Sequence, residues 1–191
     1  MNGDQLGLLG DAEAAAAATM PSPAGPLRPS RLVPPSDLDP DQSWQSCGPA
    51  ALAAARGFTL AAVRPRLPHE RGYMSPEDMR TAAIRCGFTV EEKRHAWPAF
   101  GLALIVFDGP WMQPGLPAGA MMRMAHWVAV DRHGGLAGGD LYDVNYGKVI
   151  FFEAWLHTAA DLARQLDRKA TGGWSVRIGL EITDRSQIGR T

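Results

Sequence analysis

One of the two cysteines of this chain, Cys47, lies in a segment that could activate a thiol for nucleophilic attack. Pro49 suits the first position of a helix, residues 50–56 are almost all strong helix formers, and Gly57 favours the left-handed cap that ends a helix. Cys47 is therefore expected at the positive end of a short helix, where free amide donors and the helix dipole favour the nucleophilic thiolate. The alternative is a small buried residue packed below an alanine-rich helix.

A nucleophilic thiol needs a base, and the sequence pattern favours one of the five histidines. His126 opens the apolar, strand-like run of residues 125–130. The start of a strand holds a ring rigidly and is expected close to a sheet edge, where a site is open to substrate. The alternative for His126 is a hydrogen-bonded histidine of the core. The other four histidines occur in predicted loops and turns, at the polar end of a strand, or in a helical pattern: His69, His133, His95 and His157.

A candidate orienting group follows in the strand and turn of residues 141–147. A carboxylate or amide here could accept the imidazole N–H, select its tautomer and stabilise the imidazolium. Strand alternation would put Asp143 and Asn145 on one face, with Val144 on the other. We assign the role to Asp143, which is nearer the body of the strand, with Asn145 as the substitute. The competing interpretation is turn chemistry, because both residue types favour turns before glycine.

The order Cys, His, Asp or Asn, with the cysteine opening a helix after a glutamine, resembles that of the papain-like cysteine peptidases. Residues 47–52, the strand of residues 126–130 and Asp143 are most similar to one bacterial branch, the double-glycine leader peptidases, which trim bacteriocin precursors. The similarity spans roughly residues 41–147 and thins out beyond them. It implies a Cys47, His126, Asp143 triad that acts on peptides without a metal or another cofactor.

The resemblance also implies an oxyanion donor, and here the sequence departs from the family pattern. The family has a glutamine usually six positions before the cysteine, and that position is Asp41 in this chain. Gln42 lies five positions before Cys47 and Gln45 two before it. We assign Gln42 to the oxyanion hole because it is nearest to the expected offset, with Gln45 as the alternative.

Composition excludes several other classes of function. A formal net charge of -1 provides no electrostatic basis for binding nucleic acid or an anionic membrane. No apolar stretch reaches the length of a membrane-spanning helix, and no CxxC or HExxH spacing predicts a zinc site. We therefore expect no nucleic acid, no membrane insertion and no metal. Cys86 is expected to pack at the end of a helix.

The first forty residues differ from the rest, with an alanine-rich patch at residues 12–18 and many prolines at residues 21–40. Acidic residues interrupt the apolar run, so it does not match a secretory signal peptide. We interpret residues 1–38 as a flexible or extended arm that could dock on a domain formed by residues 39–191. The predicted location is the cytoplasm, or export by a dedicated secretion system without a cleaved signal peptide, as for a secreted effector.

The rest of the sequence predicts an α+β fold, with an N-terminal helix packed on an antiparallel sheet. Expected helices cover residues 49–56, 76–86 and 153–168, the second starting at a Ser75–Asp78 capping box. Expected strands cover residues 88–93 (an edge strand), 102–107, 124–131, 140–144, 148–152 and 174–182, the last closing the sheet. The long loop of residues 108–122 holds four large apolar residues, namely Trp111, Met112, Met121 and Met122. They either cover the core, which we favour, or line a substrate groove beside His126.

We interpret the chain as a papain-like cysteine hydrolase that acts on a peptide or isopeptide bond of a peptide or protein substrate. The same triad also performs deamidation and acyl transfer, because the acyl-enzyme can be resolved by different nucleophiles. Two further alternatives are a catalytically inactive module that binds a peptide or partner, and an assembly component with a packed cysteine. The shifted glutamine favours the inactive module.

Overall fold

The structure, a computed structural model, describes residues 29–39, 46–69, 73–116, 124–132 and 138–185. Its helices are α2 (Cys47–Arg56), α3 (Leu60–Val63), the 3-10 helix η3 (Arg64–Arg66), α4 (Pro76–Arg85) and α6 (Phe152–Leu166). Its strands are β1 (Phe88–Arg94), β2 (Phe100–Phe107), β3 (Ala125–Asp131), β4 (Asp140–Asp143), β5 (Lys148–Phe151) and β6 (Trp174–Asp184). Among these residues the strands form one six-stranded sheet in the order β1-β6-β2-β3-β4-β5.

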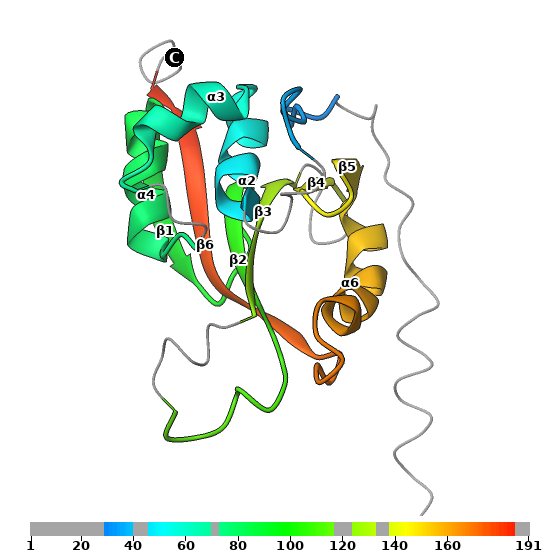
Figure 1. The fold of residues 1–191 in the computed structure, drawn as a ribbon. Coiled ribbons are helices and arrows are strands. Elements are labelled where there is room, and N and C mark those ends of the chain that lie inside the picture. Colours follow the sequence, from blue (N-terminus) through cyan, green and yellow to red (C-terminus); the bar gives the residue numbers. More distant parts are fainter. Residues whose placement is uncertain (1–28, 40–45, 70–72, 117–123, 133–137, 186–191) are drawn as a thin grey trace, which may run out of the picture.

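Helices cover both faces of this sheet, because alternate residues of its central strands point to opposite sides. Leu102, Leu104 and Val106 of β2 pack into the α2 core, the buried cluster shared with α2 and α4. Ala103, Ile105 and Phe107 pack instead into the α6 core, the buried cluster shared with α6. Figure 1 shows α2, α3 and α4 grouped together and α6 apart from them. The predicted α+β fold is confirmed: the helix that carries Cys47 packs on the antiparallel sheet that carries His126 and Asp143.

The last strand was expected to close the sheet, and this expectation is wrong. Strand β6 lies inside the sheet, antiparallel to β1 on one side and to β2 on the other. The apolar side chains of β6, such as Leu180 and Ile182, are buried there. The predicted edge position of β1 is confirmed, and its charged residues 91–94 suit an edge because they oppose pairing with another chain.

Helix α2 begins at Cys47, two residues earlier than expected, so that Pro49 is its third residue rather than its first. Amide groups in the first turn of a helix have no acceptor within the helix, so a proline there sacrifices no hydrogen bond. The C-terminal prediction is confirmed: Gly57 adopts φ 68° and its N–H bonds the carbonyl of Ala53.

The capping box that starts α4 is also confirmed. The Ser75 hydroxyl accepts a hydrogen bond from the Asp78 amide at 3.2 Å, and the Asp78 carboxylate accepts one from the Ser75 amide at 3.0 Å. The helix ends at Arg85, and Cys86 is buried at its C-terminal cap as expected. Burial raises the pKa of the Cys86 thiol, which keeps that cysteine protonated and unreactive.

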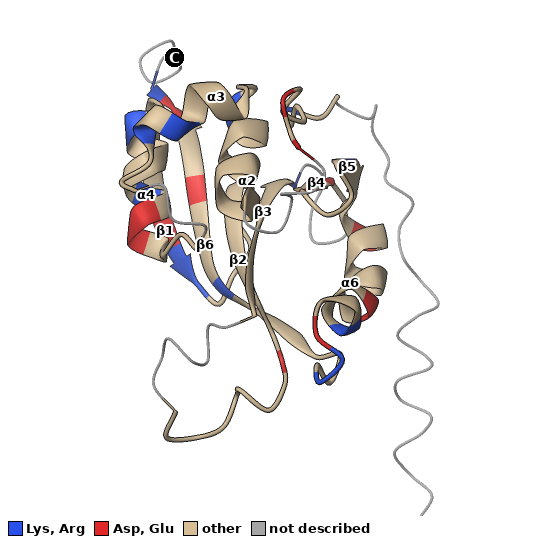
Figure 2. Cartoon of the chain, in the orientation of Figure 1, with Lys and Arg blue, Asp and Glu red and all other residues tan. Residues whose placement is uncertain are grey.

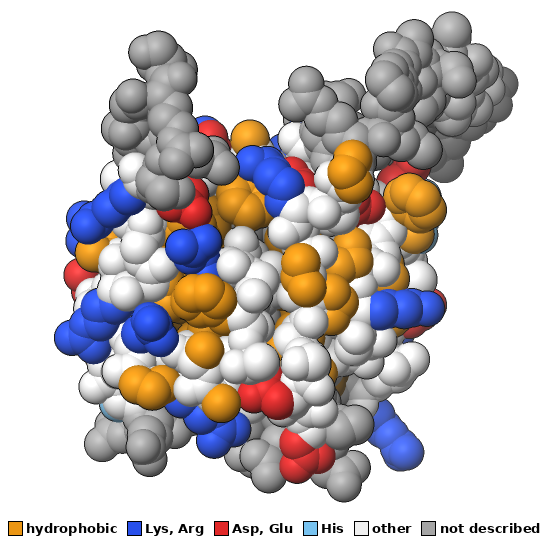
Figure 3. Space-filling view, turned by 90° about the horizontal axis from the view of Figure 1, so that it is seen from above, with side chains coloured by type: hydrophobic (Ala, Val, Ile, Leu, Met, Phe, Trp, Pro, Cys, Tyr) orange, Lys and Arg blue, Asp and Glu red, His pale blue; other side chains and the backbone are white. Residues whose placement is uncertain are grey.

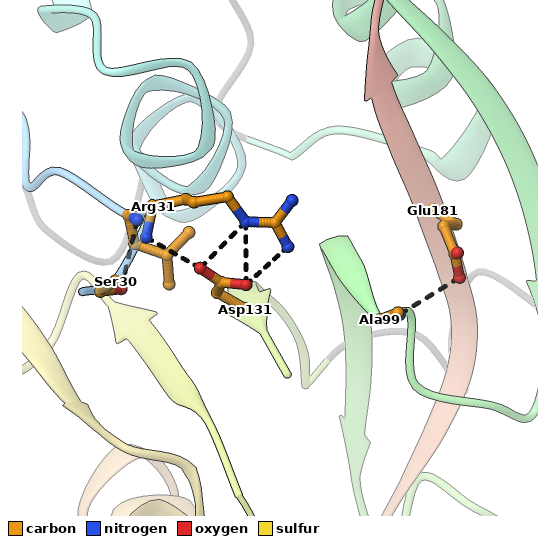
Figure 4. A network of polar contacts seen from close by, with 6 residues as sticks. Ser30, Arg31, Ala99, Asp131 and Glu181 are labelled. Carbon is orange, nitrogen blue, oxygen red and sulfur yellow. Dashed lines mark hydrogen bonds and ion pairs between the residues drawn. The ribbon is translucent and has the colours of Figure 1, made fainter. Parts of the chain in front are cut away.

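Part of the predicted N-terminal arm packs on the domain. The Arg31 side chain and backbone amide all donate to the carboxylate of Asp131, the last residue of β3 (Figure 4). The guanidinium also lies 3.8 Å from the centroid of the Phe100 ring. Asp131 is 1% exposed, so its charge is paired in a site shielded from water.

The residues after Arg31 attach to the helices. Leu32 is buried in the α2 core, and the Val33 amide donates to the carbonyl of Ala54 near the end of α2 at 3.0 Å. Asp37 accepts the amides of Leu60 and Ala61, at 2.6 and 2.9 Å, and these bonds lower the pKa of Asp37 although its slight burial opposes them. We call residues 30–37 the strap, because it joins the end of β3 to α2 and α3.

The helix lengths and the distribution of charged and apolar side chains characterise the surface of the described residues. No helix in this part of the chain is both long and apolar enough to span a membrane. Lysine and arginine are spread over several elements (Figure 2). On the face seen in Figure 3, apolar side chains occur in separate groups between charged ones.

The loop after β2 directs its tryptophan inward. Trp111 is 7% exposed, packs in the α6 core and donates its indole N–H to the carbonyl of Phe107 at 2.8 Å. The core interpretation of Trp111 is therefore confirmed, and Met112 is partly buried against both cores. Met121 and Met122 lie outside the described residues.

We expect Trp111→Ala to lower the free energy of unfolding by about 3–5 kcal/mol, because a large aromatic side chain leaves a cavity in the core. Urea denaturation measures the change. Leu116→Ala is the control in the same loop: Leu116 is 37% exposed, so its removal should change stability by less than about 0.5 kcal/mol. Equal effects of the two substitutions would contradict the core position of Trp111.

Candidate active site

Cys47 lies in the first turn of α2, against the α2 core, and is 9% exposed. The turn approaches its neighbours closely at the next residue, Gly48. A Cβ at Gly48 would lie 3.0 Å from the Met79 sulfur and 3.1 Å from Cγ of Met74. Glycine thus allows the first turn of α2 to pack closely on the side chains of Met74 and Met79.

His126 lies on β3, one residue before Trp127. The expectation that it sits near an open sheet edge is wrong: β3 lies between β2 and β4, and His126 is 0% exposed. Its backbone pairs with Ile105 of β2, and its ring stacks with that of Phe107 at a centroid distance of 6.5 Å. The sequence pattern identified the strand, but not the neighbours that enclose its start.

Asp143 holds the imidazole directly. Its Oδ1 lies 2.9 Å from Nε2 of His126, and both side chains are fully buried. The same oxygen accepts the backbone and side-chain N–H groups of Asn145 at 2.9 and 3.0 Å. Oδ2 accepts the indole N–H of Trp155 at 2.8 Å. The carboxylate therefore has donors on both oxygens, as a buried charge requires.

The structure brings Asn145 to the same place, in a different role. Its Nδ2 lies 3.3 Å from Nε2 of His126 and also donates to Asp143. The strand ends at Asp143 rather than at Val144, and residues 144–147 form a turn in which Gly147 has φ 63°. Both candidates reach the ring as expected, but Asn145 does so from this turn. Gln42 and Gln45 lie outside the described residues.

The charges in the site depend on one another. Burial alone would lower the pKa of His126, but the charge and hydrogen bond of Asp143, and then those of Cys47, raise it to about 10. Burial alone would raise the pKa of Asp143, but the charge and hydrogen bond of His126 and the donors from Trp155 and Asn145 lower it. The buried pair is therefore an imidazolium and a carboxylate at neutral pH. Cys47 is also among the groups that raise the pKa of this imidazole.

Sequence reasoning missed the role of Trp155, which lies within the predicted helix of residues 153–168. It is 0% exposed in the α6 core, and its indole N–H is its one polar group. A buried tryptophan usually finds an acceptor for this group, so a tryptophan on the inner face of the helix was the available signal. That signal does not identify the acceptor.

The arrangement contains the parts needed for nucleophilic catalysis at an acyl carbon. Cys47 offers a sulfur nucleophile, His126 a proton carrier whose pKa Cys47 helps to raise, and Asp143 the anion that orients the ring. Among the described residues, no group of three or more His, Cys, Asp or Glu side chains could hold a metal ion.

Comparison with known proteins provides little additional information. No family model matches the chain, and no curated protein matches it. Among solved structures, the chain is similar to the peptidase domain of Streptococcus ComA, a bi-functional ABC transporter involved in a quorum sensing pathway. The identity is 17%, the TM-score is 0.40, and the match covers 78% of this chain and 96% of the ComA domain.

The raised pKa of His126 predicts how stability depends on pH. The folded protein holds the imidazole proton up to about pH 10, whereas an unfolded histidine releases it near pH 6.5. This contribution to stability is therefore complete below about pH 6.5 and is lost as the pH rises to about 10. Urea denaturation at pH 6, 8 and 10 should show the stability difference between wild type and His126→Gln shrinking with pH. A constant difference would contradict the raised pKa.

The bond between Trp155 and Asp143 predicts a second pH effect, of opposite sign. Trp155→Phe should lower the free energy of unfolding by about 1.5–3 kcal/mol at neutral pH, because it removes a hydrogen bond to a charged group. Because Trp155 helps to lower the pKa of Asp143, this loss should shrink at acid pH, once Asp143 of the variant takes up its proton. Trp174→Phe is the control, since Trp174 packs 5.6 Å from the Trp155 ring and its loss should not depend on pH in this range. A pH-independent effect of Trp155→Phe would mean that only its volume matters.

Proposed function

We propose that this chain is a papain-like cysteine hydrolase that cleaves a peptide or isopeptide bond through a thioester acyl-enzyme. The observation that carries the proposal is the buried pair of His126 and Asp143, joined at 2.9 Å, together with Cys47, which helps to raise the pKa of the same imidazole. The sequence motifs around these residues support a place near the double-glycine leader peptidases. The substrate proposed is accordingly a peptide or protein.

The proposed reaction begins with the thiolate of Cys47 and the imidazolium of His126. The sulfur attacks the carbonyl carbon, and the carbonyl oxygen takes the negative charge of the tetrahedral intermediate. His126 then gives its proton to the leaving amine, the C–N bond breaks, and a thioester remains on Cys47. Water attacks the thioester after passing a proton to His126, and release of the acid restores the thiolate and imidazolium.

Two groups would stabilise the oxyanion. One is the backbone N–H of Cys47, which belongs to the first turn of α2 and has no acceptor within the helix. The other is Gln42, assigned by the resemblance. Asp143 stays ionised throughout and orients His126, while Trp155 and Asn145 hold Asp143 in place.

A second candidate function is a catalytically inactive module of the same fold that binds a peptide or a partner. The observation that favours it is the low exposure of the site, 9% for Cys47 and 0% for His126. An active enzyme of this geometry must admit a carbonyl carbon to the sulfur. The two functions therefore differ in whether small electrophiles reach Cys47.

Thiol alkylation distinguishes the two functions. We expect iodoacetamide at pH 6 to modify Cys47 at least about tenfold faster than Cys86, because the proposed mechanism requires a reactive sulfur at Cys47, whereas burial disfavours the Cys86 thiolate. Mass spectrometry of the digested protein measures both rates. His126→Gln should remove the difference and Cys86→Ala should leave the Cys47 rate unchanged.

Hydrolysis is tested by measuring cleavage of a mixture of unrelated peptides. Cys47→Ala should reduce cleavage by several powers of ten without loss of folding, because members of a triad act as a unit. Cleavage that survives in Cys47→Ala would contradict the hydrolase proposal. If Cys47 of the wild type is alkylated no faster than Cys86, the inactive module becomes the better interpretation.

A further inference from the structure

The two edges of the sheet differ in how well they are protected against pairing with another chain. Strand β1 forms one edge and carries charged residues at positions 91–94. Strand β5 forms the other edge (Figure 1) and carries one charge, Lys148, followed by three apolar residues. Phe151, the last of these, is 68% exposed, more than any other large apolar side chain among the described residues. An edge strand without guarding charges is a template for pairing with a further strand.

Two backbone groups of β5 face this edge. The hydrogen bonds of an antiparallel pair alternate between the two sides of a strand. The amide of Phe152, just after β5, donates to the carbonyl of Gly139, just before β4, at 3.0 Å. The N–H of Phe151 and the C=O of Val149 therefore point away from β4. Within the described part of the chain, no residue forms a hydrogen bond with either group.

The two ends of β5 carry exposed charges of opposite sign. Lys148 begins the strand, and Glu153 follows it in the first turn of α6. Neither side chain forms an ion pair with another described residue. The extended chain separates the two residues by about 15 Å, which is too far for an ion pair within one molecule. A second β5 in antiparallel orientation would place each charge beside its opposite.

We propose that β5 pairs antiparallel with β5 of a second copy of this chain, around a two-fold axis at Ile150. Each Phe151 N–H then donates to the Val149 carbonyl of the other copy, and each Phe151 ring packs beside the other copy's Val149. Lys148 of each copy approaches Glu153 of the other. A second copy suits the edge because the strand itself supplies both members of every contact, as a closed two-fold dimer requires.

The contact is confined to one short strand from each copy. An interface of this size forms weak dimers, so we expect a Kd on the order of 10–500 µM. The inference does not depend on the proposed function.

Sedimentation equilibrium of the full chain measures the association. Phe151→Pro is the decisive variant, since Phe151 already has φ -61° and proline removes the N–H that faces the edge. It should raise the Kd at least about tenfold without loss of folding, because the dimer loses two hydrogen bonds. Phe151→Ala removes the ring but keeps the N–H, so it should weaken the dimer less. Val33→Ala is the control at an exposed apolar residue on the strap, and should leave the Kd unchanged.

Charge reversal identifies which residues meet between the copies. Lys148→Glu and Glu153→Lys should each raise the Kd about tenfold, because two attractive contacts become repulsive. An equimolar mixture of the two variants should associate with the wild-type Kd, since each reversed charge then meets the opposite charge of the other variant.

Three results would overturn the inference. A wild type that stays monomeric at about 1 mM would leave β5 open to another occupant, such as an extended peptide. A dimer that Phe151→Pro leaves intact would use a different surface. A mixture of the charge variants that associates no more tightly than either variant alone would contradict the antiparallel pairing of β5.

Discussion

The arrangement of the site depends on a buried ion pair between His126 and Asp143. Removing an imidazolium and a carboxylate from water is costly, and their mutual attraction offsets that cost only when the remaining polar atoms are also bonded. Here the indole of Trp155 and both N–H groups of Asn145 complete the carboxylate. The pair is consequently stable as charges, and Cys47 helps to keep the imidazole charged.

This ion pair needs a sheet with two separate cores. Strand β3 contributes Trp127 to the α2 core and Val128 to the α6 core. The α2 core brings Cys47 to the strand, while α6 supplies Trp155 for the carboxylate. A helix on one face alone would leave either the thiol or the carboxylate without its partner. The fold thus serves the site by enclosing β3 from both sides.

The strap extends this logic to the far end of the same strand. Arg31 pairs with Asp131, the last residue of β3, and Val33 bonds Ala54 near the last turn of α2. Strand β3, which carries His126, and helix α2, which carries Cys47, are therefore joined at both ends, by the strap at one end and by Met74 at the other. Such double attachment restricts the sliding of α2 along β3, which would change the separation of sulfur and imidazole.

The sequence by itself determined the class of the fold and the approximate helices and strands, because periodicity, caps and turn residues are local properties of the chain. Local properties left alternatives open for Cys47, His126 and Asp143, and it was the resemblance to a known family that grouped them. The sequence did not reveal the position of β6 inside the sheet, the enclosure of His126 or the bond from Trp155. Each of these joins residues far apart in the sequence, and their partners are chosen by packing of the whole chain. Only the tertiary structure decided that an apolar tryptophan of α6 orients the carboxylate, since many buried acceptors could satisfy the same indole.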